Sequence, residues 1–254
     1  MRAVANPQKK PLLGASVGLD LAVSSRRGVH VTRIVHSSPA ALSGSLALGD
    51  VIVSIDAKPV NDETGEEELR AALAGEEGSP VWLEVSPAAG AMVKMIVLVR
   101  QAPLEPELDD ITGELGFEAV YHASGCRVVG HVEGGAAWLA ALAHNSDAPA
   151  GARRFIHEGN IIVGIDGSRL GGKDPEQMRK IMRGRAFERV ALEALDSEDG
   201  SRVTWRCDMV RAPRLAPASV ERALAYRRSA NEVLQCPSMR TYTCQMQTRA
   251  VHFP

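Results

Sequence analysis

The chain has 254 residues, 45% hydrophobic and 24% charged, with 23 Gly and 14 Pro. This composition is typical of globular domains and excludes collagen-like, coiled-coil and wholly disordered chains. The net charge of −2 is unevenly spread, with +3 on residues 1–10, −4 on 11–103, −5 on 104–213 and +4 on 214–254, so two acidic bodies have basic ends.

Several classes of protein are disfavoured by simple counts. Aromatic residues are only 4%, which argues against stacking surfaces for nucleic acid. The longest apolar run, 92–99, is short and contains Lys94, and the N-terminal MRAVANPQKK lacks an apolar signal segment, so neither a membrane span nor secretion is expected. Four cysteines without CxxC or metal-ligand spacing indicate reduced thiols in a cytoplasmic protein without metal or cofactor; they are Cys126, Cys207, Cys236 and Cys244.

The first hundred residues predict short strands and two helices. Strands are expected at 18–23, 29–35, 50–56, 81–85 and 95–99, because β-branched runs there are bounded by turn residues. A short helix is expected to open at Ser38 and Pro39 and to end near Gly44. A second helix is expected from Thr64, with Glu67 completing a capping box.

The same pattern then recurs. The segment LGDVIVSIDAKPV (48–60) returns as EGNIIVGIDGSRL (158–170), displaced by 110 residues. Blocks on both sides return in the same order: 28–41 as 125–138, 69–75 as 178–184, and 81–85 as 190–194. A repeat of this length is a whole domain, which predicts one domain at 1–103 and another at 104–213.

The second repeat has two features of its own, and a tail follows it. Residues 143–154 are extra and predict an extended surface loop. Asp174 and Gln177 around Pro175 predict a capped second helix. In the tail, 214–254, one helix is expected at about 219–235, with Val220, Leu224 and Leu234 as its apolar stripe.

These residues resemble a pair of PDZ domains, over about 8–103 and 108–213. The resemblance depends on the loops Val17-Gly18-Leu19 and Leu115-Gly116-Phe117, the Ser-Pro-Ala-Ala helix opening, and the repeated Gly-x-x-Ile-Val-x-Ile-Asp strand. It implies a mostly β fold with two helices per domain: two partly open β-barrel or sandwich domains in tandem, followed by a C-terminal helical tail. The Ser16 in the first loop stands where the family usually has Gly.

The resemblance also implies a peptide-binding groove between the strand after each loop and the second helix. A peptide would add there as a β-strand, with its carboxylate at the loop N–H groups. Gly18 and Gly116 are expected because backbone must approach the ligand. The implied peptide-binding residues are Val17, Gly18, Leu19, Leu21, Glu66, Arg70 and Leu73 in the first domain, and Leu115, Gly116, Phe117, Ala119, Pro175, Arg179 and Met182 in the second.

Alternatives stay open for several of these residues. The apolar ones are equally typical of strand-interior core. Glu66 and Pro175 stand where the commonest ligand class has His, so neither groove belongs to that class. Arg70 and Arg179 fit either ligand contacts or a solvated helix face, and a slip of one residue would bring Leu69 or Met178 into the groove instead.

The function expected is a non-catalytic intracellular adaptor that binds peptide segments or C-termini of other proteins. The string 167–174 lacks the Ser or Thr of a phosphate loop, and neither a small-molecule substrate nor nucleic acid is expected. The alternative is an assembly module with degenerate grooves, working as a rigid two-domain unit or as an accessory of a protease.

The charges predict that the first groove is the better binder of free C-termini. Lys9 and Lys10 precede the first loop, whereas Asp109 and Asp110 precede the second and Glu114 lies within it. Cations favour a carboxylate and anions oppose it.

Overall fold

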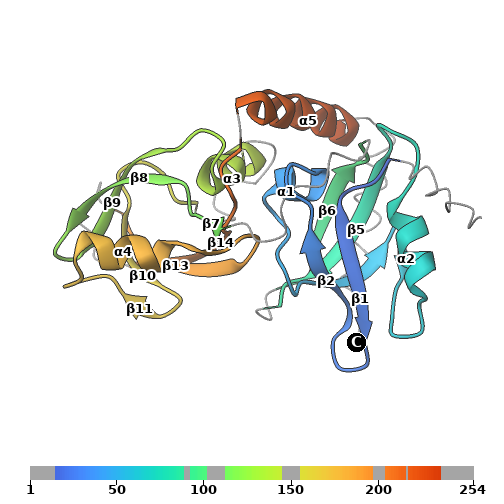
Figure 1. Ribbon diagram of the computed structural model, residues 1–254, viewed down its shortest axis with the longest axis horizontal. Helices are drawn as coiled ribbons and strands as arrows, with labels where there is room; N and C mark the ends of the chain where they lie inside the picture. The colour runs from blue at the N-terminus through green and yellow to red at the C-terminus, as the bar shows by residue number, and fades with distance from the viewer. Residues whose placement is uncertain are drawn as a thin grey trace, which may run out of the picture.

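The computed structural model describes residues 15–88, 92–101, 112–144, 155–196, 204–215 and 217–235, which form two β-rich domains beneath a C-terminal helix (Figure 1). The first domain has an antiparallel sheet of order β1-β2-β3-β5-β6 with β4 paired to β3. Its elements are β1 (Leu19–Ser24), β2 (Gly28–Ile34), α1 (Pro39–Ser43), β3 (Val51–Ile55), β4 (Lys58–Pro59), α2 (Glu66–Leu73), β5 (Pro80–Ser86) and β6 (Lys94–Val99).

The second domain repeats this topology. Its sheet has the order β14-β13-β10-β9-β8, with β11 paired to β10 and a small β7-β12 pair beside it. Its elements are β7 (Thr112–Gly113), β8 (Phe117–His122), β9 (Gly125–His131), α3 (Ala136–His144), β10 (Ile161–Ile165), β11 (Ser168–Arg169), α4 (Pro175–Met182), β12 (Gly184–Arg185), β13 (Arg189–Leu195) and β14 (Thr204–Val210). The predicted mostly β architecture of two domains and a C-terminal helix, α5 (Pro217–Gln235), is confirmed.

The repeat extends to irregular features of the backbone. The register shifts between Asp20 and Leu21 in the first sheet and between Glu118 and Ala119 in the second. The repeated aspartates, Asp56 and Asp166, both take a φ of 49° in the turn after the third main strand, and each accepts a hydrogen bond from a backbone N–H of the neighbouring strand. Aspartate tolerates this left-handed conformation better than most residues, which explains why it recurs.

Two of the three predicted helix starts are confirmed. Ser38 caps α1 and Gly44 ends it with a φ of 61°, and Asp174 forms a capping box with Gln177 at α4. The capping box predicted at Thr64 is wrong, because α2 begins only after Gly65, without a side-chain cap. The Thr64 hydroxyl instead donates to the side chain of Asn61 in the preceding turn.

The terminal helix lies across the top of both domains (Figure 1). Its buried stripe consists of Val220, Ala223, Tyr226 and Ala230. The predicted stripe was therefore wrong at Leu224, which is 37% exposed, because the helix is buried along positions separated by three to four residues that include Tyr226 and two small alanines. The side chain of Leu234 lies outside the described residues.

Polar contacts join the two domains directly. The Arg189 guanidinium lies 2.6 Å from the carboxylate of Asp50, which is fully buried. The Leu48 N–H donates to the Phe187 carbonyl at 2.9 Å. From α5, Arg227 donates to the last carbonyls of α1, at Leu42 and Ser43, with distances of 3.2 and 2.6 Å.

Apolar side chains cross the same boundary. Ala186, Phe187 and Val210 of the second domain are buried in the core cluster of the first, whereas Leu42 and Val99 of the first are buried in that of the second. Each core is thus completed by its neighbour, which makes the domains one packed unit.

Some predictions fall outside the described residues. These are most of the 143–154 loop, the charged residues Lys9, Lys10, Asp109 and Asp110, and the thiols of Cys236 and Cys244. Cys126 and Cys207 are free, and burial raises the pKa of each thiol to about 12. Within the described part of the chain, none of the helices has the length and apolar character to cross a membrane.

Candidate peptide-binding groove

The loop before β8 is held by hydrogen bonds to its carbonyl groups. The Leu115 carbonyl accepts from the Ala137 N–H at 3.0 Å, and the Gly116 carbonyl accepts from the Val132 N–H at 2.9 Å. Within the described residues, the N–H groups of Leu115 and Gly116 donate no hydrogen bond. Adjacent N–H groups of this kind form a site for a carboxylate.

The loop glycines pack closely against the start of the helix that follows each loop. Gly116 has a φ of 69°, and a Cβ there would lie 2.8 Å from the Ala136 N at the start of α3. In the first domain, Gly18 has a φ of 72°, and a Cβ would lie 2.2 Å from the Cβ of Ser38. Glycine is thus required at both positions because the loop packs against the start of the following helix, while the predicted approach of a ligand stays a prediction.

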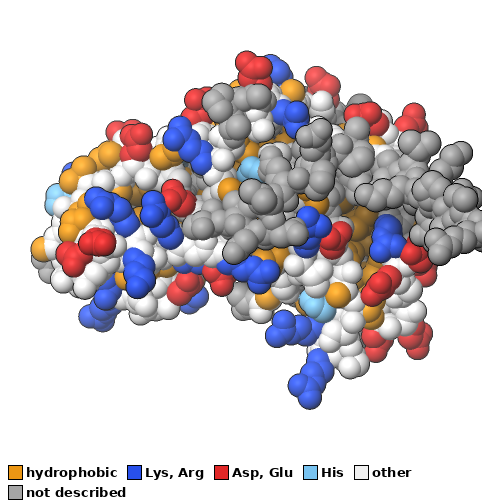
Figure 2. Space-filling model, viewed as in Figure 1, with side chains coloured by type: hydrophobic (Ala, Val, Ile, Leu, Met, Phe, Trp, Pro, Cys, Tyr) orange, Lys and Arg blue, Asp and Glu red, His pale blue; other side chains and the backbone are white. Residues whose placement is uncertain are grey.

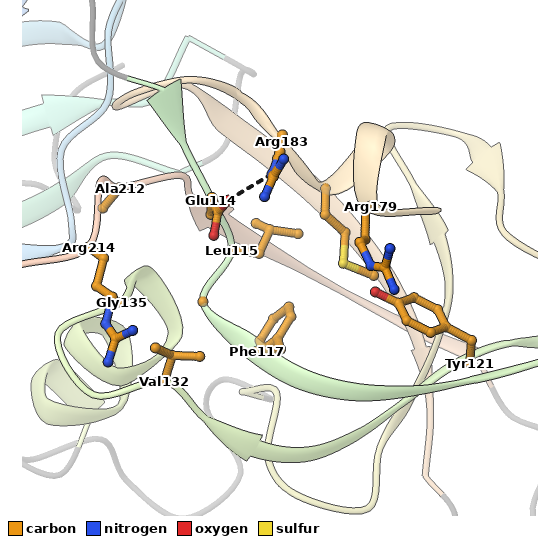
Figure 3. Close-up of a pocket in the computed structure, with 12 residues that line it drawn as sticks. Glu114, Leu115, Phe117, Tyr121, Val132, Gly135, Arg179, Arg183, Ala212 and Arg214 are labelled. Atoms are coloured by element: carbon orange, nitrogen blue, oxygen red, sulfur yellow. Dashed lines mark hydrogen bonds and ion pairs between the residues drawn. The ribbon is translucent and has the colours of Figure 1, made fainter. Parts of the chain in front are cut away.

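A pocket of about 200 Å³ opens beside the second loop, between β8 and α4 (Figure 3). Five of the predicted residues line it: Leu115, Gly116, Phe117, Arg179 and Met182. The predicted Ala119 and Pro175 are not among the lining residues. Met178, considered as an alternative groove residue, is 1% exposed and belongs to the core.

Three arginines surround this pocket, and two were missed from the sequence. The Arg183 guanidinium lies 2.8 Å from the Glu114 carboxylate, the pair joined by a dashed line in Figure 3. Arg214 donates to the Glu133 carbonyl at 3.3 Å. Arg179 lies over the Tyr121 ring, 5.5 Å from its centroid.

The remaining lining residues missed from the sequence are Tyr121, Val132, Gly135 and Ala212. The alternation of β8 was a usable signal for Tyr121, since it shares a strand face with Phe117 and Ala119. No local pattern distinguishes Arg183 or Arg214, because they reach the loop from distant parts of the chain.

The structure changes one part of the charge argument for the predicted asymmetry, that of Glu114, whereas Lys9, Lys10, Asp109 and Asp110 lie outside the described residues. Glu114 does not stand alone, because Arg183 neutralises it, and Arg179 and Arg214 add positive charge nearby. The second pocket thus carries more cationic than anionic side chains among its lining residues, which favours a carboxylate. The Lys and Arg side chains visible over α4 in Figure 2 agree with this.

In the first domain, the apolar residues predicted for the groove are mostly buried. Here α2 packs directly against β1, whereas α4 approaches β8 less closely. Val17, Leu19 and Leu73 are 0%, 7% and 3% exposed and belong to the core. Leu69 is likewise buried, at 2%, so the strand-interior interpretation holds for these residues.

The polar residues predicted for the first groove are either paired with a neighbour on α2 or exposed. Arg70 forms an ion pair with Glu67 one turn earlier on α2. Glu66 is exposed at the start of the helix, and Leu21 is half-buried against the core. The Gly18 N–H lies 3.4 Å from the Ser16 hydroxyl, a weak contact that places the unusual serine over the loop amide.

Both second helices are held at their C-terminal ends by a buried arginine. In the second domain, Arg211 donates to the Ile181 and Met182 carbonyls at 3.1 and 3.3 Å. In the first, Arg100 donates to the Ala72 and Leu73 carbonyls at 2.9 and 3.2 Å. These carbonyls lack partners within the helix, so each arginine fixes the position of one groove wall.

Beneath the pocket, His131 supports Phe117. Its ring centroid lies 6.2 Å from that of Phe117 and 5.6 Å from that of Phe155. The ring contacts the Ile156 carbonyl at 3.1 Å. Burial lowers the pKa of His131 below its ordinary value of 6.5, so the ring is neutral near pH 7.

One family model matches part of the chain. Residues 30–86 match the PDZ domain, and a search of curated proteins gave no match. The topology that surrounds this segment recurs, strand for strand, in the second domain.

Three similar solved structures illustrate the range of sequence identity and coverage. The PDZ domain of a carboxy-terminal protease from Vibrio cholerae, in complex with peptide, is 26% identical, with coverage of 35% of this chain and 95% of that chain and a TM-score of 0.32. The photosystem II D1 C-terminal processing protease is 24% identical, with coverage of 46% of this chain and 30% of that chain and a TM-score of 0.35. The complex of INAD PDZ45 with NORPA CC-PBM is 13% identical, with coverage of 81% of this chain and 90% of that chain and a TM-score of 0.22.

Proposed function

Since the chain consists of two PDZ-like domains in tandem and a C-terminal helix, we propose that it is a peptide-binding adaptor whose working groove lies in the second domain. Its ligand is the C-terminal segment of a partner protein. The first domain serves mainly as a rigid support. Cytoplasmic location and the absence of catalysis are parts of the same proposal.

The observation that carries the proposal is the open pocket at the second loop. It combines the free N–H groups of Leu115 and Gly116 with apolar walls from Phe117 and Met182. The loop amides suit a terminal carboxylate, and the apolar walls suit an aliphatic terminal side chain. In the first domain, the corresponding Leu19 and Leu73 are 7% and 3% exposed.

The rest of the peptide would bind by strand addition. β8 is the last strand of its sheet, so its outer edge is free to pair with another strand. A peptide lying antiparallel to β8 would have its C-terminus at the loop and its earlier residues between β8 and α4.

The packed interface supports the role of the first domain. The ion pair of Asp50 with Arg189 and the shared cores fix the second domain against the first. A groove held on a rigid body loses less entropy when it binds a ligand. The alternative of a rigid unit with degenerate grooves is therefore kept for the first domain only, as the support of the second.

The test is a fluorescence anisotropy titration of the full chain with an array of hexapeptides that end in Val, Leu or Ile. Each peptide is made with a free and with an amidated C-terminus. We expect binding by some free-carboxylate peptides, and a loss of about tenfold on amidation, equivalent to about 1.4 kcal/mol.

A matched pair of variants locates the binding. Arg183→Ala removes a cation beside the loop and leaves Glu114 unpaired, so carboxylate peptides should bind more weakly, whereas Arg185→Ala, exposed and outside the pocket, should have no effect. Absence of binding across the array, or equal binding of acid and amide, contradicts the proposal.

A further inference from the structure

Like Arg214, which donates to the Glu133 carbonyl, Arg179 is a pocket cation that forms no ion pair among the described residues. Its side chain is exposed. Its counterpart, Arg70, is paired with Glu67. Glu176 occupies the place of Glu67 on α4, yet no ion pair joins it to Arg179 among the described residues.

Tyr121 holds this guanidinium in place. Arg179 lies 5.5 Å above the ring centroid, and Figure 3 shows the two side chains facing each other across the groove, from α4 and from β8. A cation over an aromatic face is attracted to it and stays available for hydrogen bonds from its edge. The charge is therefore positioned before any ligand arrives.

The distance along β8 places Arg179 beside residues that precede the peptide's C-terminus. Tyr121 is four residues beyond Phe117, which lines the pocket at the loop, and a strand rises about 3.4 Å per residue, or about 14 Å over this span. In an antiparallel added strand, alternate side chains face α4. The side chains two and four residues before the terminal one thus pass Arg179.

Other charges near this part of the groove do not cancel it. Glu114 is engaged by Arg183 at the opposite end of the pocket. Glu118 lies next to Gly130, whose added Cβ would be 3.4 Å from the Glu118 carboxylate, so it covers β9 rather than the groove. Lys180, the next residue on α4, adds a further positive charge.

We infer that the second groove selects peptides that carry an acidic side chain two or four residues before the C-terminal residue, recognised by Arg179 held over Tyr121. This inference rests on the proposed function, since it assumes that a peptide lies along β8. It assigns the ligand a chemistry: a free C-terminus, an aliphatic last residue, and an upstream carboxylate.

The experiment is a positional scan on the full chain. A Val-terminated hexapeptide of Ala and Ser receives a single Glu at each of the four positions before the last residue, and binding is measured by anisotropy. We expect Glu at the second or fourth position before the end to tighten binding by about fivefold to tenfold, and Glu at the first to change it little.

Three variants assign the effect to Arg179. Arg179→Ala should abolish the preference for Glu, so that the Glu peptides and the all-neutral peptide bind equally well. Arg179→Glu should reverse it, so that a Lys peptide becomes the better ligand. Arg70→Ala, at the matching position of the first domain, should leave the preference unchanged.

The failures are distinguishable. If neutral and acidic peptides bind equally well in their free-carboxylate forms, the acidic preference is overturned and the proposed function stands. If the preference survives in Arg179→Ala, its assignment to Arg179 is overturned. If none of the peptides binds, acidic ones included, the proposed function fails and this inference fails with it.

Discussion

Leu19 and Phe117 occupy the same position in the two repeats, yet their surroundings differ. Leu19 is 7% exposed in the first core, whereas Phe117 is half-buried at the edge of the second pocket. An aspartate at Leu19 would place an unpaired charge in the core, so Leu19→Asp should destabilise the protein by about 3–5 kcal/mol. Urea unfolding followed by circular dichroism measures this loss.

The partner variant should separate binding from folding. Phe117→Asp should cost less stability, about 1–2 kcal/mol, because water reaches the site, and should weaken peptide binding by about tenfold or more. Equal destabilisation by the two variants would show that Phe117 is core as well.

His131 makes the pocket floor sensitive to acid. Burial is the largest cause and lowers its folded-state pKa, and the nearby His157 lowers this pKa as well. The hydrogen bond with the Ile156 carbonyl and the charge of Glu158 act in the opposite direction. The unfolded chain therefore binds the proton more readily, and stability that is present above the ordinary value of 6.5 is lost as the pH falls through the folded value.

The predicted effect is small because the ring is partly solvated. Between pH 7.5 and 5, the free energy of unfolding should fall, with the contribution of His131 below about 1 kcal/mol. His131→Gln should flatten this dependence, whereas the exposed His122→Gln should not. Unfolding curves with the same slope against pH in all three proteins rule out the assignment.

At the scale of elements, each groove helix depends on one buried arginine from the closing strand. Arg211 holds the last carbonyls of α4, and Arg100 those of α2. Removing either leaves buried carbonyls without donors, so Arg211→Ala and Arg100→Ala should each cost about 2–4 kcal/mol.

Their effects on peptide binding should differ. Arg211→Ala releases the wall of the open pocket and should weaken binding, whereas Arg100→Ala acts on the groove of the first domain and should leave binding within about twofold. The comparison is made by anisotropy at a temperature where both variants are folded. Equal weakening of binding by Arg211→Ala and Arg100→Ala would contradict binding in the second groove alone.

At the scale of the whole molecule, α5 joins the domains through Tyr226. This residue is 2% exposed, and its hydroxyl accepts from the Val99 N–H of β6 at 3.4 Å. Tyr226→Ala should cost about 3–5 kcal/mol and split one unfolding transition into two. Leu224→Ala, 37% exposed on the same helix, should change stability by less than about 0.5 kcal/mol.

Calorimetry and urea unfolding would check this prediction. Two separate transitions in the unmodified protein would contradict cooperative unfolding of the two domains. A single unchanged transition in Tyr226→Ala would show that α5 does not couple them. The expectation follows from the membership of the two cores, since Phe187 belongs to the core cluster of the first domain and Leu42 to that of the second.

Local order along the chain was sufficient to predict the repeated topology. The period of the strands, the cap at Ser38 and the box at Asp174 all depend on neighbours a few residues away, which sequence patterns record. The repeated order of blocks then placed both sheets. Thr64 failed because a turn residue, Asn61, competed for its hydroxyl.

Which groove is open was decided only by the tertiary structure. Leu19 and Phe117, or Leu73 and Met182, follow the same pattern in the sequence, and the spacing between strand and helix is what buries one pair and exposes the other. Arg183 and Glu114 meet across 69 residues, and Tyr226 reaches β6 across 127. Periodicity reports which side of an element is apolar, but not what packs against it, because that depends on contacts between distant segments.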